Sequence, residues 1–132
     1  MARFETITDA AIETLVDRFY ARARQDALLG PVFARAIADD AWPEHIRIIN
    51  DFWSSLLLKT GRYHRNPFRM HQGIQGLSPA MFERWLGLFG ETCHERFVPA
   101  VAEHIVTKAR LIGDSLQAGL FFDPKAPVSQ TR

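Results

Sequence analysis

The sequence has a single cysteine, no long apolar run and no excess of charge of either sign. Because Cys93 has no second cysteine to pair with, the chain forms no internal disulfide, as is common for proteins of a reducing compartment. The longest aliphatic run covers residues 56–58 only, too few to span a membrane, and the N-terminus lacks the apolar core of a signal peptide. We therefore expect a cytoplasmic protein with no membrane association.

The charges nearly balance, with a formal net charge of +1 at pH 7, so no basic face points to a nucleic-acid partner. Hydrophobic residues make up 47% and charged residues 23% of the 132 residues, values typical of a globular protein. That length supports one hydrophobic core without disulfides or a structural metal. We predict a single domain over residues 1–122, and we expect the polar, proline-rich tail 123–132 to be disordered.

Apolar and polar residues do not alternate over the length of a strand, and no segment repeats, so the predicted fold class is all-α. Thr8 or Asp9 is a suitable N-cap for a first helix that extends to about Gln25. Gly30 and Pro31 interrupt the chain after it, and a short apolar segment follows.

Three later helices are predicted from caps, prolines and glycines. The expected starts are Asp39 or Asp40, Ser78 and Pro99, and the expected ends of the first and the last of these helices are Gly61 and Gly119. Residues 61–77, which contain three glycines and Pro67, are predicted to be mostly loop, with one helical turn around His71.

Three familiar metal motifs are incomplete in this sequence. A carboxylate-bridged di-iron bundle needs two Glu-x-x-His motifs, whereas the stretch ETCH at residues 91–94 is a single copy. The covalent haem motif C-x-x-C-H would need a cysteine where Gly90 stands. A zinc site is equally poor with one cysteine. Any haem would therefore be bound non-covalently.

His71 lies in the stretch RNPFRMHQGIQGLSP, between basic residues and glycines. Phe68 and Met70 beside it can pack, while Arg65 and Arg69 can reach an anion. A neutral imidazole presented from a short helical turn is suited to axial ligation of haem iron, and the arginines would then pair with the haem propionates. The alternative is a solvated basic loop.

Three further polar side chains lie at or near apolar helix faces. His45 precedes Ile49 and Phe52 on one face, so its imidazole would lie at the mouth of an apolar surface. Tyr20 and Trp85 lie on or near the buried stripes of their helices, where such residues are usually part of the core. If both point into one cavity, they supply an O–H and an N–H donor to whatever binds there.

Taken together, these motifs resemble the truncated haemoglobins, and most closely the third group of that family. The resemblance extends from about Thr8 to about Leu120. It rests on the order and spacing of short motifs: RFY with Tyr20, LLGPVF with Phe33, PEHIRIINDFW with His45, Ile49, Phe52 and Trp53, FRMH with His71, and FERW with Trp85. The glycine pairs typical of other truncated globins are missing, because LLGP and KTGR each hold one glycine.

The resemblance implies a two-over-two helical sandwich around one haem b. His71 matches the axial iron ligand of the family, and Phe33 matches the phenylalanine that packs on the haem face. The positions that match the distal pocket, where the gas ligand binds, are Tyr20, His45, Ile49 and Trp85. We also expect the cofactor to contact Phe52, Trp53, Arg65, Phe68 and Arg69.

The function implied is binding of O2, NO or CO. If Tyr20 and Trp85 both donate to bound O2, they contribute about 3–6 kcal/mol, or roughly two to four decades in retention. Such slow release favours redox chemistry on O2, NO or peroxide, as in NO dioxygenases and peroxidases, over reversible oxygen transport or storage. With no flavin or nicotinamide motif in the chain, a reductase would be a separate partner. The alternative class is a cofactor-free helical interaction or sensor module, and we expect a monomer or weak dimer.

Overall fold

The computed structural model describes residues 2–121, and these residues fold almost entirely into helices. The helices in chain order are α1 (Asp9–Ala23), α2 (Gly30–Ala36), the short 3-10 helix η1 (Asp39–Ala41), α3 (Trp42–Leu58), α4 (Pro67–Gln72), α5 (Pro79–Arg96) and α6 (Pro99–Leu120). The predicted all-α class is confirmed. The tail 123–132, and with it the expected disorder, lies outside the described residues.

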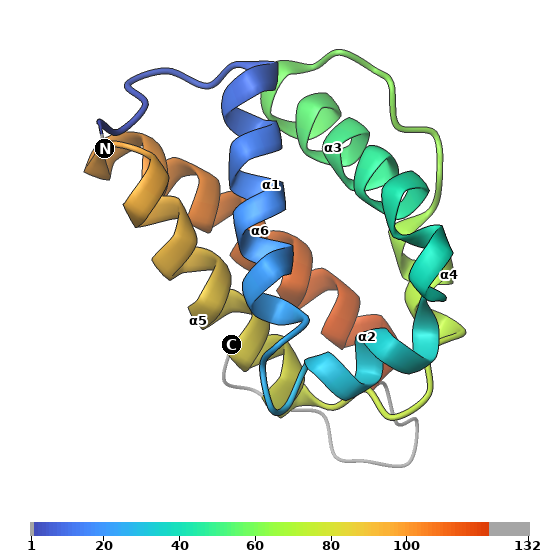
Figure 1. The fold of residues 1–132 in the computed structure, drawn as a ribbon. Helices are drawn as coiled ribbons and strands as arrows, with labels where there is room; N and C mark the ends of the chain where they lie inside the picture. Colours follow the sequence, from blue (N-terminus) through green and yellow to red (C-terminus); the bar gives the residue numbers. More distant parts are fainter. Residues whose placement is uncertain (1, 122–132) are drawn as a thin grey trace.

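The helices form two layers. Helix α1 packs on both α3 and α5, α5 packs on α6, and α6 carries the short helix α4 (Figure 1). This is the two-over-two sandwich that the sequence led us to expect. None of the helices within residues 2–121 combines the length and the apolar character needed to cross a membrane.

Several helix ends agree with the sequence-based predictions. Thr8 caps α1, since its side chain accepts a hydrogen bond from the backbone N–H of Ala11 at 3.1 Å. Helix α4 is the predicted turn around His71, and its N-cap is Asn66, whose side chain accepts from the Arg69 backbone. Helix α5 begins after Ser78 as expected, although the Ser78 side chain makes no capping hydrogen bond.

The predicted boundaries of α3 were wrong at both ends. Asp39 and Asp40 form the separate turn η1, and the N-cap of α3 is Ala41, which offers no side-chain acceptor. At the other end, Lys59 adopts a left-handed conformation with φ 59° and ends the helix two residues before Gly61. The expected end at Gly61 rested on the preference of glycine for positive φ, but lysine takes that role here.

Gly30 begins α2 rather than only interrupting the chain. A Cβ atom at this position would lie 2.6 Å from the carbonyl oxygen of Arg24, so the corner between α1 and α2 closes only around a glycine. Pro31 follows in the first turn of α2, where its missing N–H costs no helical hydrogen bond.

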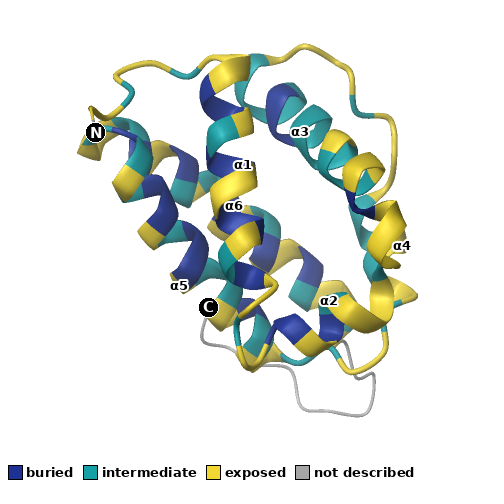
Figure 2. Ribbon diagram, in the orientation of Figure 1, coloured by how far each residue is buried: buried dark blue, intermediate teal, exposed yellow. Residues whose placement is uncertain are grey.

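The core lies where α1, α5 and α6 meet (Figure 2). Its largest fully buried apolar side chains are Phe19, Phe89, Phe97, Ile12, Leu15 and Ile105. Burying each such side chain contributes about 1.5–3 kcal/mol. This part of the fold is closed by the protein's own side chains.

Helices α3 and α4 are less buried than the three helices of the core. In the seventeen residues of α3 only Trp42, Trp53 and Ser54 are buried, and in α4 no residue is buried. The isoleucines and leucines along α3 are half-buried, so most of that helix is teal in Figure 2. An apolar helix face that its own chain covers incompletely is suited to contact with another apolar group.

The carboxylate of Asp26 joins three helices. Its Oδ2 accepts hydrogen bonds from the backbone N–H groups of Leu28 and Leu29, both at 3.0 Å, at the start of α2. Its Oδ1 accepts from Arg84 of α5 at 2.7 Å, and the Asp26 side chain is only 7% exposed. Asp26 itself follows the end of α1. The pair therefore fixes the second turn of α5 against the corner between α1 and α2.

We expect Asp26→Asn to lower the free energy of unfolding by about 1–2 kcal/mol at pH 7, because hydrogen bonds to a charge are lost and Arg84 is half exposed. Arg84, followed by the Leu29 backbone, holds the pKa of Asp26 below its usual value of 3.8. That stabilisation is present above pH 3.8 and is lost as the pH falls through the lowered pKa.

Urea unfolding at several pH values measures this effect. The difference between Asp26→Asn and wild type should shrink as the pH falls below about 4. Asp114→Asn on the exposed face of α6 is the matched control and should change little. An equal cost for both substitutions at pH 7 would contradict the role given to Asp26.

Candidate functional site

The imidazole of His71 is oriented by its own short helix. The distance from His71 Nδ1 to the carbonyl oxygen of Pro67 is 2.7 Å. Since a carbonyl can only accept, Nδ1 carries the proton and donates, and Nε2 is left with a free lone pair. This is the tautomer that a histidine needs to bind a metal through Nε2, with its other nitrogen held by a backbone carbonyl.

Helix α4 is held on α6 through Phe68. The ring of Phe68 occupies the space that a Cβ atom would take at Gly119, so the two helices approach closely at this point. Helix α4 also contacts α5, because the centroid of the His71 ring lies 6.3 Å from that of the Phe82 ring. A cavity of about 420 Å³ separates α2 from α4 and the following loop, with Val32, Met70 and Ile74 among its walls.

His45 on α3 and His71 on α4 lie close enough to influence one another. Burial lowers the pKa of His45, and the charge of His71 lowers it further. His45 is therefore neutral at pH 7. The two imidazoles, 26 residues apart in the sequence, reach the same region from two different helices.

Tyr20 lies next to His45 and contacts Phe33. Its ring centroid is 5.9 Å from that of His45 and 5.6 Å from that of Phe33. Burial raises the pKa of Tyr20, and a hydrogen bond from the Trp85 side chain opposes this shift. The phenol therefore keeps its proton at neutral pH and can donate it in a hydrogen bond. Tyr20 and Trp85 do come together, as the sequence suggested.

The structure also qualifies that suggestion. Trp85 lowers the pKa of Tyr20, which indicates that its indole N–H lies toward the phenol oxygen and that the two donors are arranged in series. In this arrangement the O–H of Tyr20 is the donor for a ligand, and Trp85 polarises and orients it. Residue spacing alone does not distinguish this arrangement from two independent donors.

Residues on α3 divide between two faces. Ile49 and Phe52 are half-buried, and their spacing of four and seven residues from His45 places them on its face of the helix. Trp53 is only 3% exposed and stacks on Phe89 at 5.0 Å, which places it in the core. Contact between Trp53 and a cofactor stays a prediction.

Trp42 belongs to the site, although the sequence analysis did not select it. Its ring lies 5.8 Å from Tyr20, 5.3 Å from His45 and 5.8 Å from Phe33. The guanidinium of Arg24 lies over its outer side, 4.3 Å from the ring centroid. The signal that could have found it is its position three residues before His45 on one helix.

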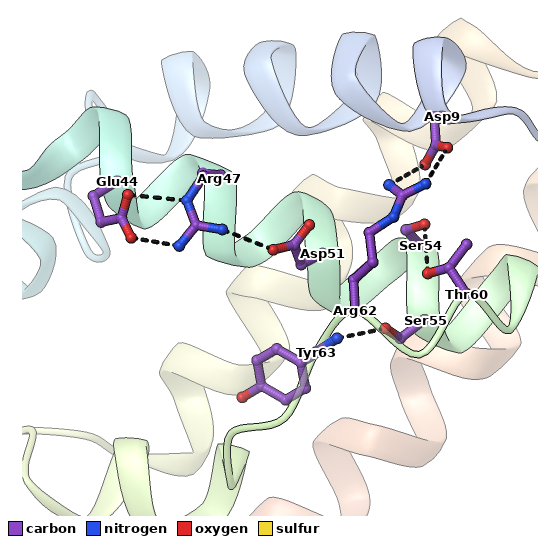
Figure 3. Close-up of polar contacts among 9 residues, drawn as sticks. All are labelled: Asp9, Glu44, Arg47, Asp51, Ser54, Ser55, Thr60, Arg62 and Tyr63. Atoms are coloured by element: carbon purple, nitrogen blue, oxygen red, sulfur yellow. Dashed lines mark hydrogen bonds and ion pairs between the residues drawn. The ribbon is translucent and has the colours of Figure 1, made fainter.

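The segment that leads from α3 to α4 is held at three points, of which the first is a hydrogen bond of 3.0 Å between the hydroxyl groups of Thr60 and Ser54 (Figure 3). Arg62 donates two hydrogen bonds to Asp9 at the start of α1, and the backbone N–H of Tyr63 donates to Ser55 Oγ at 2.8 Å. The Tyr63 ring packs against Phe52 at 5.1 Å. These contacts set the point from which the chain turns toward His71.

Arg65 and Arg69 are exposed, and neither has an ion-pair partner within residues 2–121. Arg47 donates hydrogen bonds to Glu44 (Figure 3) and is the main cause that lowers the pKa of Glu44. Arg65 lowers that pKa to a smaller extent. Arg65 therefore lies near Glu44 in the first turn of α3. Both arginines are free to bind an anionic group at the edge of the site.

The comparisons with known proteins agree with this geometry. The group 3 truncated hemoglobin ctb of Campylobacter jejuni is 34% identical over 121 residues, which cover 90% of this chain and 95% of that protein. The crystal structure of group III truncated hemoglobin from Campylobacter jejuni matches with a TM-score of 0.86 over 90% of this chain and 95% of that one, at 34% identity. No family model matches the chain.

Sequence identity at this level, over nearly the whole length of both chains, is accompanied by the same helical sandwich. The resemblance that the motifs suggested is thereby confirmed. The chain belongs to the group 3 truncated haemoglobins.

Proposed function

We propose that the protein binds one haem b non-covalently, with Nε2 of His71 as the axial ligand. The observation that carries this proposal is the hydrogen bond from His71 Nδ1 to Pro67, which leaves Nε2 as a metal-binding nitrogen in the region that His45 also reaches. Membership of the truncated haemoglobins supports it.

The residues present fit this group. Haem b is a flat, mostly apolar molecule, and the half-buried face of α3 with Ile49 and Phe52 offers it an apolar wall. Phe33 of α2 lies at the Tyr20 side of that wall. Arg65 and Arg69, without carboxylate partners among the described residues, can pair with the two propionates.

When bound, haem supplies an iron centre that takes O2, NO or CO and exchanges electrons. The chain supplies the surroundings of the ligand. Tyr20 donates its O–H to the negative charge that the ligand acquires, a contribution of about 1.5–3 kcal/mol, or roughly one to two decades in retention. Trp85 holds the phenol in place, and the apolar side chains exclude water.

Retention of this kind favours redox chemistry on O2, NO or peroxide over oxygen delivery. The electrons would come from a separate reductase, because the chain contains no flavin- or nicotinamide-binding motif. Reversible oxygen carriage is the second candidate function, and ligand release rates decide between the two.

The assignment of His71 is tested by haem uptake. His71→Ala should bind haem with strongly reduced affinity, seen as a lost or shifted Soret band, because the only nitrogen oriented by Pro67 is removed. His94→Ala is the matched control, and it should leave the spectrum unchanged. His94 lies in α5 and pairs with Glu103 of α6 at the protein surface. An unaltered spectrum in His71→Ala would sink the assignment.

The series arrangement of the distal donors predicts a specific pattern of O2 release. Tyr20→Phe should accelerate dissociation by roughly 10- to 100-fold, because the ligand loses its donor. Trp85→Phe should have a smaller effect, because Trp85 acts through Tyr20. The double variant should resemble Tyr20→Phe alone, and stopped-flow measurements provide the rates. Additive effects would contradict the series arrangement of Trp85 and Tyr20. Rapid O2 release from wild type would contradict ligand retention by Tyr20 and favour oxygen carriage.

His45 should control ligand entry. His45→Leu should change the association rate of CO after flash photolysis, because the half-buried imidazole lies at the mouth of the site. Protonation would draw the ring toward solvent, and its pKa is lowered from 6.5, so entry in wild type should speed up only below pH 6.5. If substitution alters dissociation alone, His45 is not a gate.

A further inference from the structure

Five aromatic side chains form a continuous series from the distal site to the surface beside α3. In order these are Trp85, Phe89, Trp53, Phe52 and Tyr63, with successive ring centroids 4.8, 5.0, 5.2 and 5.1 Å apart. We call this series the aromatic column. It begins at the residue that orients Tyr20 and ends at the residue where the chain turns toward α4.

The inner part of the aromatic column is closed to water and its ends are not. Phe89 is 1% and Trp53 is 3% exposed, whereas Trp85 and Tyr63 are half-buried. The rings of Trp85 and Trp53 lie within 13° and 17° of parallel to Phe89. Most other aromatic contacts of this protein are tilted or T-shaped, the arrangement that ring quadrupoles commonly favour.

The composition of the column matters as much as its geometry. Tryptophan and tyrosine are the aromatic side chains that give up an electron most readily, and here they occupy the first, middle and last positions. Phe89 contacts both indoles, and Phe52 contacts both Trp53 and Tyr63. Each electron therefore has to cross only one intervening ring between oxidisable groups.

We propose that the aromatic column carries an electron from Tyr63 to the distal site when a peroxide is reduced there. The proposal rests on the redox function proposed above. Reduction of hydrogen peroxide to two waters takes two electrons and two protons. The haem group would supply one electron and would regain it from the separate reductase proposed above. Trp85 supplies the other electron and is refilled from Trp53 and then from Tyr63, while the two protons come from solvent. Tyr63 loses its electron together with the phenolic proton and becomes a neutral tyrosyl radical.

Tyr63 is a better final donor than Tyr20, the only other tyrosine of the chain. A phenol that loses an electron must also lose its proton. Tyr20 is 7% exposed, and burial strongly raises its pKa, so its proton has poor access to water. The half-buried ring of Tyr63 can release its proton to solvent, and its backbone is fixed by the Ser55 hydroxyl (Figure 3).

The consequence of the column would be protection of the distal pocket. An oxidising equivalent that remained there would attack the side chains that hold the ligand. At Tyr63 the radical is accessible to small reductants in solution. Peroxide could then be consumed repeatedly without loss of Tyr20 or Trp85.

The experiment mixes the ferric holoprotein with hydrogen peroxide, freezes it within seconds and records the electron paramagnetic resonance spectrum. Wild type should give a tyrosyl signal. In Tyr63→Phe that signal should be lost and a tryptophanyl signal should take its place. In Trp53→Phe, which keeps an aromatic ring in the core, the Tyr63 signal should be lost while peroxide is still consumed. Peptide mass mapping after the reaction should find oxidation at Tyr63 in wild type, and at Trp85 or Tyr20 in Trp53→Phe.

Phe4→Leu is the matched control, because Phe4 packs on Phe97 away from both the site and the aromatic column. It should retain the Tyr63 signal. A tyrosyl signal that survives in Tyr63→Phe would place the radical on Tyr20 and overturn the proposal. Peroxide consumption by wild type without any radical or oxidation at Tyr63 would overturn the column and leave the redox function standing. If wild type does not consume peroxide at all, the redox function fails with it.

Discussion

The candidate site depends on one hydrogen bond within a helix of six residues. Donation from His71 Nδ1 to the Pro67 carbonyl at 2.7 Å fixes both the tautomer and the orientation of the imidazole. Pro67 can provide this acceptor because it begins the helix, one turn before His71, after the Asn66 cap. The other features of the site gain a role only relative to that nitrogen. These are the nearby His45, the half-buried wall of α3, and two arginines without an ion-pair partner among residues 2–121.

The two sides of the site differ in how they are supported. The distal donors stand on long helices that meet in the closed core, where Phe19 contacts both Tyr20 and Trp85. Asp26 adds a polar connection between the same helices and α2. The opposite side, which carries His71 and which we call the proximal side, is built on the short helix α4, and α4 contributes no buried residue. A rigid distal side can hold a hydrogen bond to a ligand in a defined direction, as electrostatic stabilisation requires.

The sequence predicted local features better than relations between helices. The His71 turn and the Thr8 cap follow from neighbouring residues, and both were found. The cap of α3 was mispredicted because two acidic residues next to a helix start can form a separate turn, which local preferences alone do not exclude. Trp53 lies on the core side of α3 because of its partner Phe89, 36 positions away. The series order of Trp85 and Tyr20 likewise depends on two helices meeting, and Trp42 gained its place from ring contacts across three elements.

Gly119 has a consequence for how the proximal side could be adjusted. The ring of Phe68 rests where a larger residue would have its side chain, so α4 approaches α6 closely at this point. A methyl group there would push the short helix outward and move the imidazole with it, with no change to any residue that faces the ligand. The direction of Nε2 of His71 can thus be adjusted from the outer layer of the sandwich. Variation at one small residue of α6 would change the position of a metal-binding nitrogen while the composition of the pocket stays the same.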